Sequence, residues 1–177
     1  TASLTGTPLV ILEPFSKSFI SDLEGKANGK LEITGQLTEP IITGIVDVIN
    51  GGFKLNYLNT HYIINDKITF SDKGIFVKDL KLLDENKNYA TVNGGLVYDQ
   101  KRNMIVNLSG RLRKFKLLDT QLEENQTFYG TALVTGSFSI QGPFDDLYIK
   151  ADVTTIKGTK VYIPIKGYDQ AEKQEYI

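Results

Sequence analysis

Cysteine and tryptophan are absent from this chain of 177 residues, and histidine occurs once. Without cysteine there is no disulfide, no thiolate nucleophile and no zinc site built on thiolates. His61 is the only imidazole, so any Ser/His/Asp arrangement would have to include it, and the sequence contains no nucleophile elbow. A single histidine beside Tyr62 in a strand is typical of a surface or rim residue. We therefore expect no enzyme, and assign no catalytic residue, metal ligand or cofactor.

A charge bias and a long hydrophobic run are also missing. Lys and Arg number 20 against 21 Asp and Glu, and no basic stripe with interleaved aromatics occurs, so we exclude nucleic acid as a partner. No apolar run approaches the ~20 residues of a membrane-spanning helix. The first residue is Thr rather than Met, and no signal peptide is present. We therefore expect a mature product or a fragment of a longer protein.

What the sequence has in abundance is alternation. From Phe128 to Ile140 every second residue is apolar or small, and the residues between them are mostly polar. A period of two is the signature of a half-buried strand. Gly142-Pro143 ends this run, because proline cannot donate to a strand ladder. Two further apolar alternations follow within residues 147–165.

The same pattern begins at Lys30, and turn signals such as Asn50-Gly51-Gly52 separate the runs. Residues 8–13 read as a short strand, and residues 14–24 are the one helical candidate, because Phe15 and Phe19 recur at a spacing of four. We predict an all-β protein with at most one short helix near residues 14–24. We expect a single domain over residues 1–167 and a polar tail over residues 168–177.

Each strand offers one apolar face that must be covered. Small residues such as Gly94, Gly110 and Gly136 recur on that face, where they let a sheet bend sharply or another chain approach. The pattern fits a strongly curved, elongated antiparallel or mixed sheet with an apolar groove, and a sandwich or barrel with a filled core is the alternative. By alternation, the groove residues are Leu31, Ile33, Val46, Val48, Phe53, Leu55, Val92, Leu96, Val106, Leu108, Val134, Phe138, Ile149, Val153, Val161 and Ile163.

The polar motifs of the sequence do not predict a catalytic site or a metal site. Asp145-Asp146 and Glu123-Glu124 are neighbours, and neighbours in a strand point to opposite faces. Residues 84–88 resemble the start of a calcium loop, but the glycine and the closing glutamate are missing. A loop without bound metal is the interpretation we favour for them.

Three stretches, residues 23–66, 84–99 and 128–165, resemble the carboxy-terminal domain of the TamB family, within the wider AsmA-like group. The shared pattern combines spaced glycines and a proline with a following Asn-Gly-Gly-Phe and Leu-Asn-Thr-x-Tyr. The resemblance covers about residues 8–165. It implies a long, taco-like β-stack with an apolar interior, similar to bridge-like lipid-transfer proteins, and no catalytic residues.

The resemblance also implies a place and partners. It implies a periplasmic location in Gram-negative bacteria with an inner-membrane anchor in the full-length protein. The implied partners are phospholipid acyl chains and the outer-membrane barrel TamA or a related BamA-family protein. Three functions stay open: a lipid conduit between the inner and outer membranes, a chaperone-like scaffold that captures outer-membrane protein strands by β-augmentation, and a structural all-β surface domain.

Overall fold

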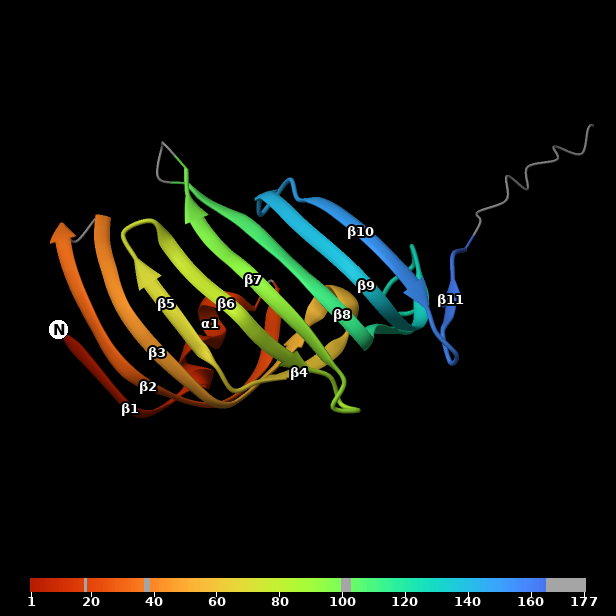
Figure 1. Ribbon diagram of the computed structural model, residues 1–177, viewed down its shortest axis with the longest axis horizontal. Helices are drawn as coiled ribbons and strands as arrows, with labels where there is room; N and C mark the ends of the chain where they lie inside the picture. The colour runs from red at the N-terminus through yellow and green to blue at the C-terminus, as the bar shows by residue number, and fades with distance from the viewer. Residues whose placement is uncertain (18, 37–38, 100–102, 165–177) are drawn as a thin grey trace, which may run out of the picture.

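One antiparallel sheet of eleven strands dominates the residues that the computed structural model describes, namely 1–17, 19–36, 39–99 and 103–164 (Figure 1). Strands make up 72% of the structure, so the predicted all-β class is confirmed. The strands are β1 (Ala2–Pro8), β2 (Ile20–Gln36), β3 (Glu39–Leu55), β4 (Thr60–Ile64), β5 (Lys67–Ser71), β6 (Gly74–Leu83), β7 (Tyr89–Tyr98), β8 (Met104–Thr120), β9 (Tyr129–Pro143), β10 (Tyr148–Thr155) and β11 (Lys160–Tyr162).

The sheet follows the chain closely. Its order is β1-β2-β3-β4-β6-β7-β8-β9-β10, with β5 between β3 and β6 and with β11 paired to β9 beside β10. Each of these pairings is antiparallel, as tight turns between consecutive strands require. The predicted polar tail, residues 168–177, lies outside the described residues.

In the part of the chain that the structure describes, helical structure is confined to three short segments: η1 (Leu9–Leu12), α1 (Glu13–Ser16) and η2 (Asn56–Leu58). The prediction of a strand at residues 8–13 is wrong. Strand β1 ends at Pro8, which has no N–H to donate to a ladder, and Pro14 then lies in the first turn of α1, where that loss costs nothing. The short helix expected near residues 14–24 is present, but it ends at Ser16.

Strand β2 then begins at Ile20, inside the stretch that was expected to be helical. Ile20 pairs with Leu55 of β3, and this long-range pairing overrides a local spacing of four. The register of β2 shifts twice after Ser21, and Asp22 there has φ of 53°. Such a bulge bends the strand.

Further β-bulges keep the alternation in phase with the apolar face. In β8 the register shifts between Leu112 and Phe115, so that both of these residues lie on the same face. Lys114 in that bulge has φ of 53°, and Asn50 in β3 and Asp79 in β6 also have positive φ. An extra residue at each place increases the twist and bends the strand.

The sheet curls toward its apolar face. In the order of the sheet β6 and β7 lie between β4 and β8, yet the rings of Tyr62 in β4 and Phe115 in β8 stack with their centroids 5.0 Å apart. Residues 53–64, which we call the covering segment, contain the end of β3, η2 and β4. In Figure 1 this segment passes behind β7 and β8.

Candidate functional site

The apolar face of the sheet is the candidate site, and the strand register shows which residues share it. Cross-strand partners in an antiparallel pair point to the same side. Three sets of partners share one face: Ile33–Ile42, Phe70–Ile75–Leu96–Val106, and Leu108–Ile140–Ile149. Ile42 lies two residues from Gly44, the partner of Phe70, and Leu108 lies two residues from Val106, so the sets continue one another. The strand pairings place every residue that the sequence assigned to the groove on this face, except Ile163. Ile163 lies beyond the end of β11 and is 72% exposed.

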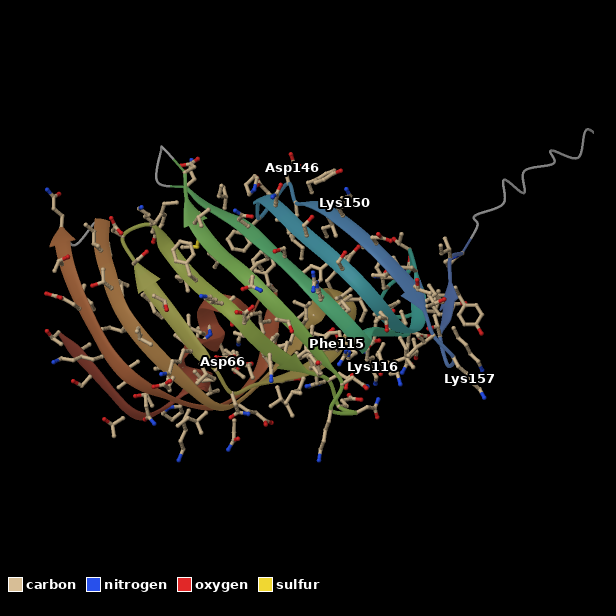
Figure 2. All side chains as sticks on the ribbon, viewed as in Figure 1. Asp66, Phe115, Lys116, Asp146, Lys150 and Lys157 are labelled. Carbon is tan, nitrogen blue, oxygen red and sulfur yellow. The ribbon has the colours of Figure 1, made fainter. Side chains whose placement is uncertain are left out.

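One end of this face is a packed core, which we call the packed end. It lies beneath the covering segment, and its buried members are Tyr62, Ala90, Leu112, Phe115, Leu118, Ala132 and Val134. Phe53, Leu55, Val92, Phe138 and Val153 pack against them. Phe115 and Val134 are each only 2% exposed. Figure 2 shows Phe115 toward the lower end of the sheet as drawn, with Asp146 at the opposite end.

A second, smaller cluster extends the core toward β3 and β6. Val48, Ile64 and Leu80 are buried there, and Leu9 of η1 packs against them. The segment that was expected to be a strand therefore helps to cover the apolar face instead.

Among the described residues, no buried side-chain nitrogen or oxygen lacks a hydrogen-bond partner. The Tyr62 hydroxyl donates to the backbone oxygen of Lys116 at 3.1 Å and accepts from Thr60 Oγ1 at 2.8 Å. Burial raises the pKa of Tyr62 to about 12 even though the Thr60 bond opposes this rise. Burial disfavours the charge of Lys116, but hydrogen bonds from its Nζ to Asp119 and Glu85 outweigh this and raise its pKa. The Tyr62 bond attaches the covering segment to β8, and the Glu85 bond attaches the loop between β6 and β7 to the same strand.

The opposite end of the face is more exposed, and we call it the open end. Ile33, Ile42 and Ile149 are 54%, 36% and 59% exposed. Leu96 and Leu108 are half-buried and belong to neither core cluster. A contact between the rings of Phe19 and Phe144, whose centroids are 5.2 Å apart, lies at the β9–β10 turn that borders this end. Apolar side chains of several strands therefore stay accessible to solvent or to a ligand.

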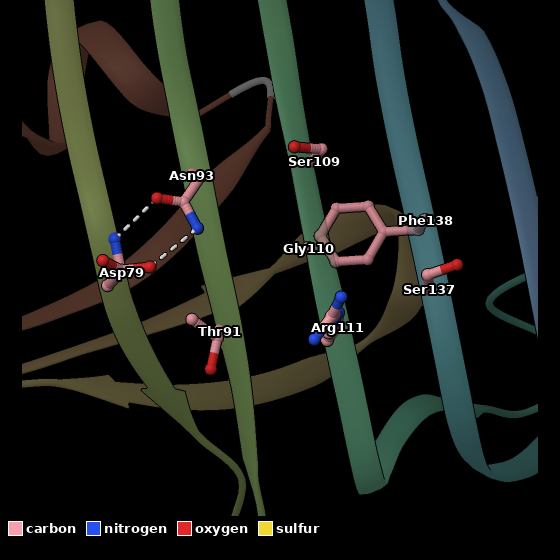
Figure 3. Close-up of a pocket in the computed structure, with 8 residues that line it drawn as sticks. All are labelled: Asp79, Thr91, Asn93, Ser109, Gly110, Arg111, Ser137 and Phe138. Atoms are coloured by element: carbon pink, nitrogen blue, oxygen red, sulfur yellow. Dashed lines mark hydrogen bonds between the residues drawn. The ribbon is translucent and has the colours of Figure 1, made fainter.

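The outer face of the sheet is mostly polar over β6 to β9. Figure 3 shows Asp79, Asn93, Ser109, Arg111 and Ser137 around a hollow of about 470 Å³. Asn93 Nδ2 donates to Asp79 Oδ1 at 3.2 Å, and the Asp79 backbone N–H donates to Asn93 Oδ1. Ile45, Ile49 and Ile63 also lie on the outer face and are 52%, 43% and 45% exposed, so this face is polar around the hollow and mixed over β3 and β4.

Glycine at position 110 is required by close packing. A Cβ there would lie 2.5 Å from the Thr91 backbone oxygen and 2.6 Å from the Phe138 ring. The aromatic ring covers the bare backbone of the neighbouring strand. This is the close approach that the small residues on this face predicted.

Sequence reasoning missed several members of the face. Phe115 and Leu118 follow bulges that shift the alternation of β8. Tyr62 belongs to the covering segment and reaches β8 only through the curl of the sheet. Ile140 had the right alternation, since it follows Val134 and Phe138 at even spacing, and this signal could have found it.

Other candidate chemistry has a local explanation. His61 is exposed, with Nε2 3.8 Å from Asp22 Oδ2. Asp84 is buried and its carboxylate accepts from the backbone N–H groups of Asn86, Asn88 and Lys116. Among the described residues we find no group of His, Asp and Glu that could hold a metal ion. Within the same residues no helix has the length and hydropathy to cross a membrane.

The fold and the apolar face define a class of protein: an all-β domain made of one curled sheet with an apolar inner face and a mostly polar outer face. The chain belongs to the TamB family, because the model of the TamB C-terminal domain matches residues 78–177, more than half of its length. The search of curated proteins and the search of solved structures found no match. The predicted family resemblance is therefore confirmed.

Membership in the TamB family indicates the general type of protein and its place in the cell. The family comprises transport and assembly modules of the cell envelope that are not enzymes. It is linked to the translocation and assembly module, and thereby to outer-membrane protein assembly with the outer-membrane protein TamA.

Proposed function

We propose that this domain is a lipid-conduit module whose apolar face shields phospholipid acyl chains in the periplasm, within a longer chain anchored in the inner membrane. Passage would run between the inner and outer membranes, with TamA or a related BamA-family barrel as the outer-membrane partner. The observation that carries the proposal is the open end, where aliphatic side chains of β2, β3 and β10 are 36–59% exposed on the same face as a packed core.

The energetics favour such an occupant. Exposing one acyl chain of about 16 carbons to water costs roughly 13 kcal/mol, at ~0.8 kcal/mol per methylene. A row of branched aliphatic residues offers contact without hydrogen-bond selectivity, so a chain can slide along it. The packed end cannot take a chain in this way, because Phe115 and Val134 already fill it. The lipid-binding part of the predicted groove is thus proposed to be the open end, with Leu31, Ile33, Leu96, Leu108 and Ile149.

A photo-crosslinking amino acid at Leu108 tests this proposal. Ser109, its outward-facing neighbour in β8, is the matched control position. The protein is exported to the periplasm and the cells are illuminated. Mass spectrometry of the purified protein should then find a phospholipid adduct at position 108 and none at 109. Equal labelling at the two positions, or no adduct at either, would contradict the proposal.

A second candidate function, the capture of a strand from an outer-membrane protein, is favoured by the exposed edge of the sheet. Strand β10 ends the described order of the sheet, and seven of its eight residues are exposed. An unpaired edge can add a strand from another chain. The Asp152 backbone oxygen faces β9, close to Gly136, so the N–H of its neighbour Ala151 points to the free edge. Ala151→Pro would remove that donor and block capture of an outer-membrane protein segment, and peptide binding should be lost while the lipid adduct at Leu108 persists.

A further inference from the structure

A basic hollow lies on the outer face, away from the apolar face. It has a volume of about 540 Å³ and is lined by Lys87, Asn88, Tyr89, Arg113, Lys114 and Thr135. Three of these residues are cationic, and none carries a carboxylate.

The β8 bulge is what places two of the cations together. Leu112 pairs with Gly136 and Phe115 pairs with Val134, so Arg113 and Lys114 both lie opposite Thr135. In a regular strand these two neighbours would point to opposite faces. The Lys114 backbone N–H donates to Thr135 Oγ1 at 3.0 Å, which fixes the bulge.

The backbone around this hollow is unusual. Lys87 and Lys114 have φ of 60° and 53°. The other described non-glycine residues with positive φ are Asn or Asp, whose side chains tolerate that region. Lysine has no such advantage, and both exceptions border one hollow. Strained backbone of this kind concentrates at functional sites.

Nearby carboxylates do not neutralise the hollow. The Asp84 carboxylate is occupied by backbone N–H groups, and Glu85 pairs with Lys116 Nζ at 2.6 Å. Within the described ranges no ion pair involves Lys87, Arg113 or Lys114.

Tyr89 orients the arginine. Arg113 Nη1 donates to the Tyr89 hydroxyl at 3.1 Å, and the Arg113 guanidinium carbon is 5.7 Å from the ring centroid. The remaining guanidinium N–H groups are available to an acceptor, since an arginine carries five donors.

We propose that this hollow binds a phosphate group, presented by a lipid headgroup or as free phosphate. Arg113 supplies the N–H donors that match phosphate oxygens, and Lys87 and Lys114 supply charge. The site is separate from the apolar face, so it does not depend on the proposed lipid conduit.

The test compares two triple variants with the same loss of charge. One is Lys87→Gln/Arg113→Gln/Lys114→Gln, and the control is Lys26→Gln/Lys30→Gln/Lys150→Gln, at exposed positions elsewhere. The probes are inorganic phosphate, by calorimetry, and vesicles of phosphatidylglycerol in phosphatidylcholine, by cosedimentation. We expect the first variant to bind about tenfold more weakly than the parent or worse, and the control to match the parent.

The two probes distinguish the source of the phosphate. Binding of inorganic phosphate by the parent identifies a site for the free ion, and binding to the vesicles alone identifies a headgroup site. Lack of binding to either probe, or equal binding by the two triple variants, would overturn the proposal.

Lys114→Asn separates function from folding. Asparagine tolerates positive φ, so this variant should raise the urea midpoint while it weakens phosphate binding. A stabilised variant that binds as tightly as the parent would remove Lys114 from the site and contradict the proposal as stated.

Discussion

The packed end and the open end are built from the same strands and the same alternation, yet they differ in what covers them. At the packed end the covering segment places Tyr62 on Phe115, and the side chains are nearly inaccessible. At the open end Ile33 and Ile149 stay more than half exposed. Alternation therefore decides which residues share a face, and the curl of the sheet decides which of them form a core.

The largest effect is expected from a charge at the packed end. Val134→Asp places a carboxylate among buried aliphatic and aromatic groups without a partner, which costs several kcal/mol and exceeds what a domain of ordinary stability tolerates. Circular dichroism during urea unfolding should show no cooperative transition. Val134→Ala is the control and should lose only about 1–3 kcal/mol. A folded Val134→Asp would show that this end is not a packed core.

High pH should loosen the packed end next. The pKa of Tyr62 is raised to about 12 in the folded protein, above an ordinary value of 10.0. The folded state therefore holds this proton more tightly than the unfolded state does. The resulting stabilisation is complete below pH 10 and is lost as the pH rises through about 12.

The loss amounts to about 2–3 kcal/mol, since one pKa unit corresponds to ~1.4 kcal/mol. Urea midpoints of the parent should fall between pH 10 and 12, and those of Tyr62→Phe should fall less. Parallel profiles for the two proteins would show that Tyr62 does not cause the decline.

A smaller effect is expected where the Phe19 ring meets the β9–β10 turn. Phe144→Ala removes a ring pair whose members are both partly exposed, so we expect a loss of about 0.5–1.5 kcal/mol. Tyr148→Ala, at a position that is 69% exposed, is the control and should change stability by less than about 0.5 kcal/mol. Equal losses would mean that the Phe19–Phe144 contact contributes nothing specific.

The class of fold could be predicted from the sequence because period-two alternation is a local signal. It runs through Val134 and Phe138 without interruption. Phe115 was missed because the bulge at Lys114 shifts the alternation by one residue, and a bulge leaves no strong mark in a single sequence.

The covering segment was unpredictable for a different reason. Tyr62 and Phe115 are far apart in the chain, and their contact depends on how the bulges bend the whole sheet. Residues 8–13 were misjudged because an apolar run reads alike as a strand or as a short helix.

The central claim, that the open end is free to hold lipid, is tested most directly by Leu108→Arg. An arginine there can reach water, so we expect the urea midpoint to stay close to that of the parent, with a loss below about 1.5 kcal/mol. Native mass spectrometry should then find that phospholipid bound to the parent is absent from the variant. Unfolding like that expected of Val134→Asp, or a folded variant that keeps as much lipid as the parent, would contradict the claim.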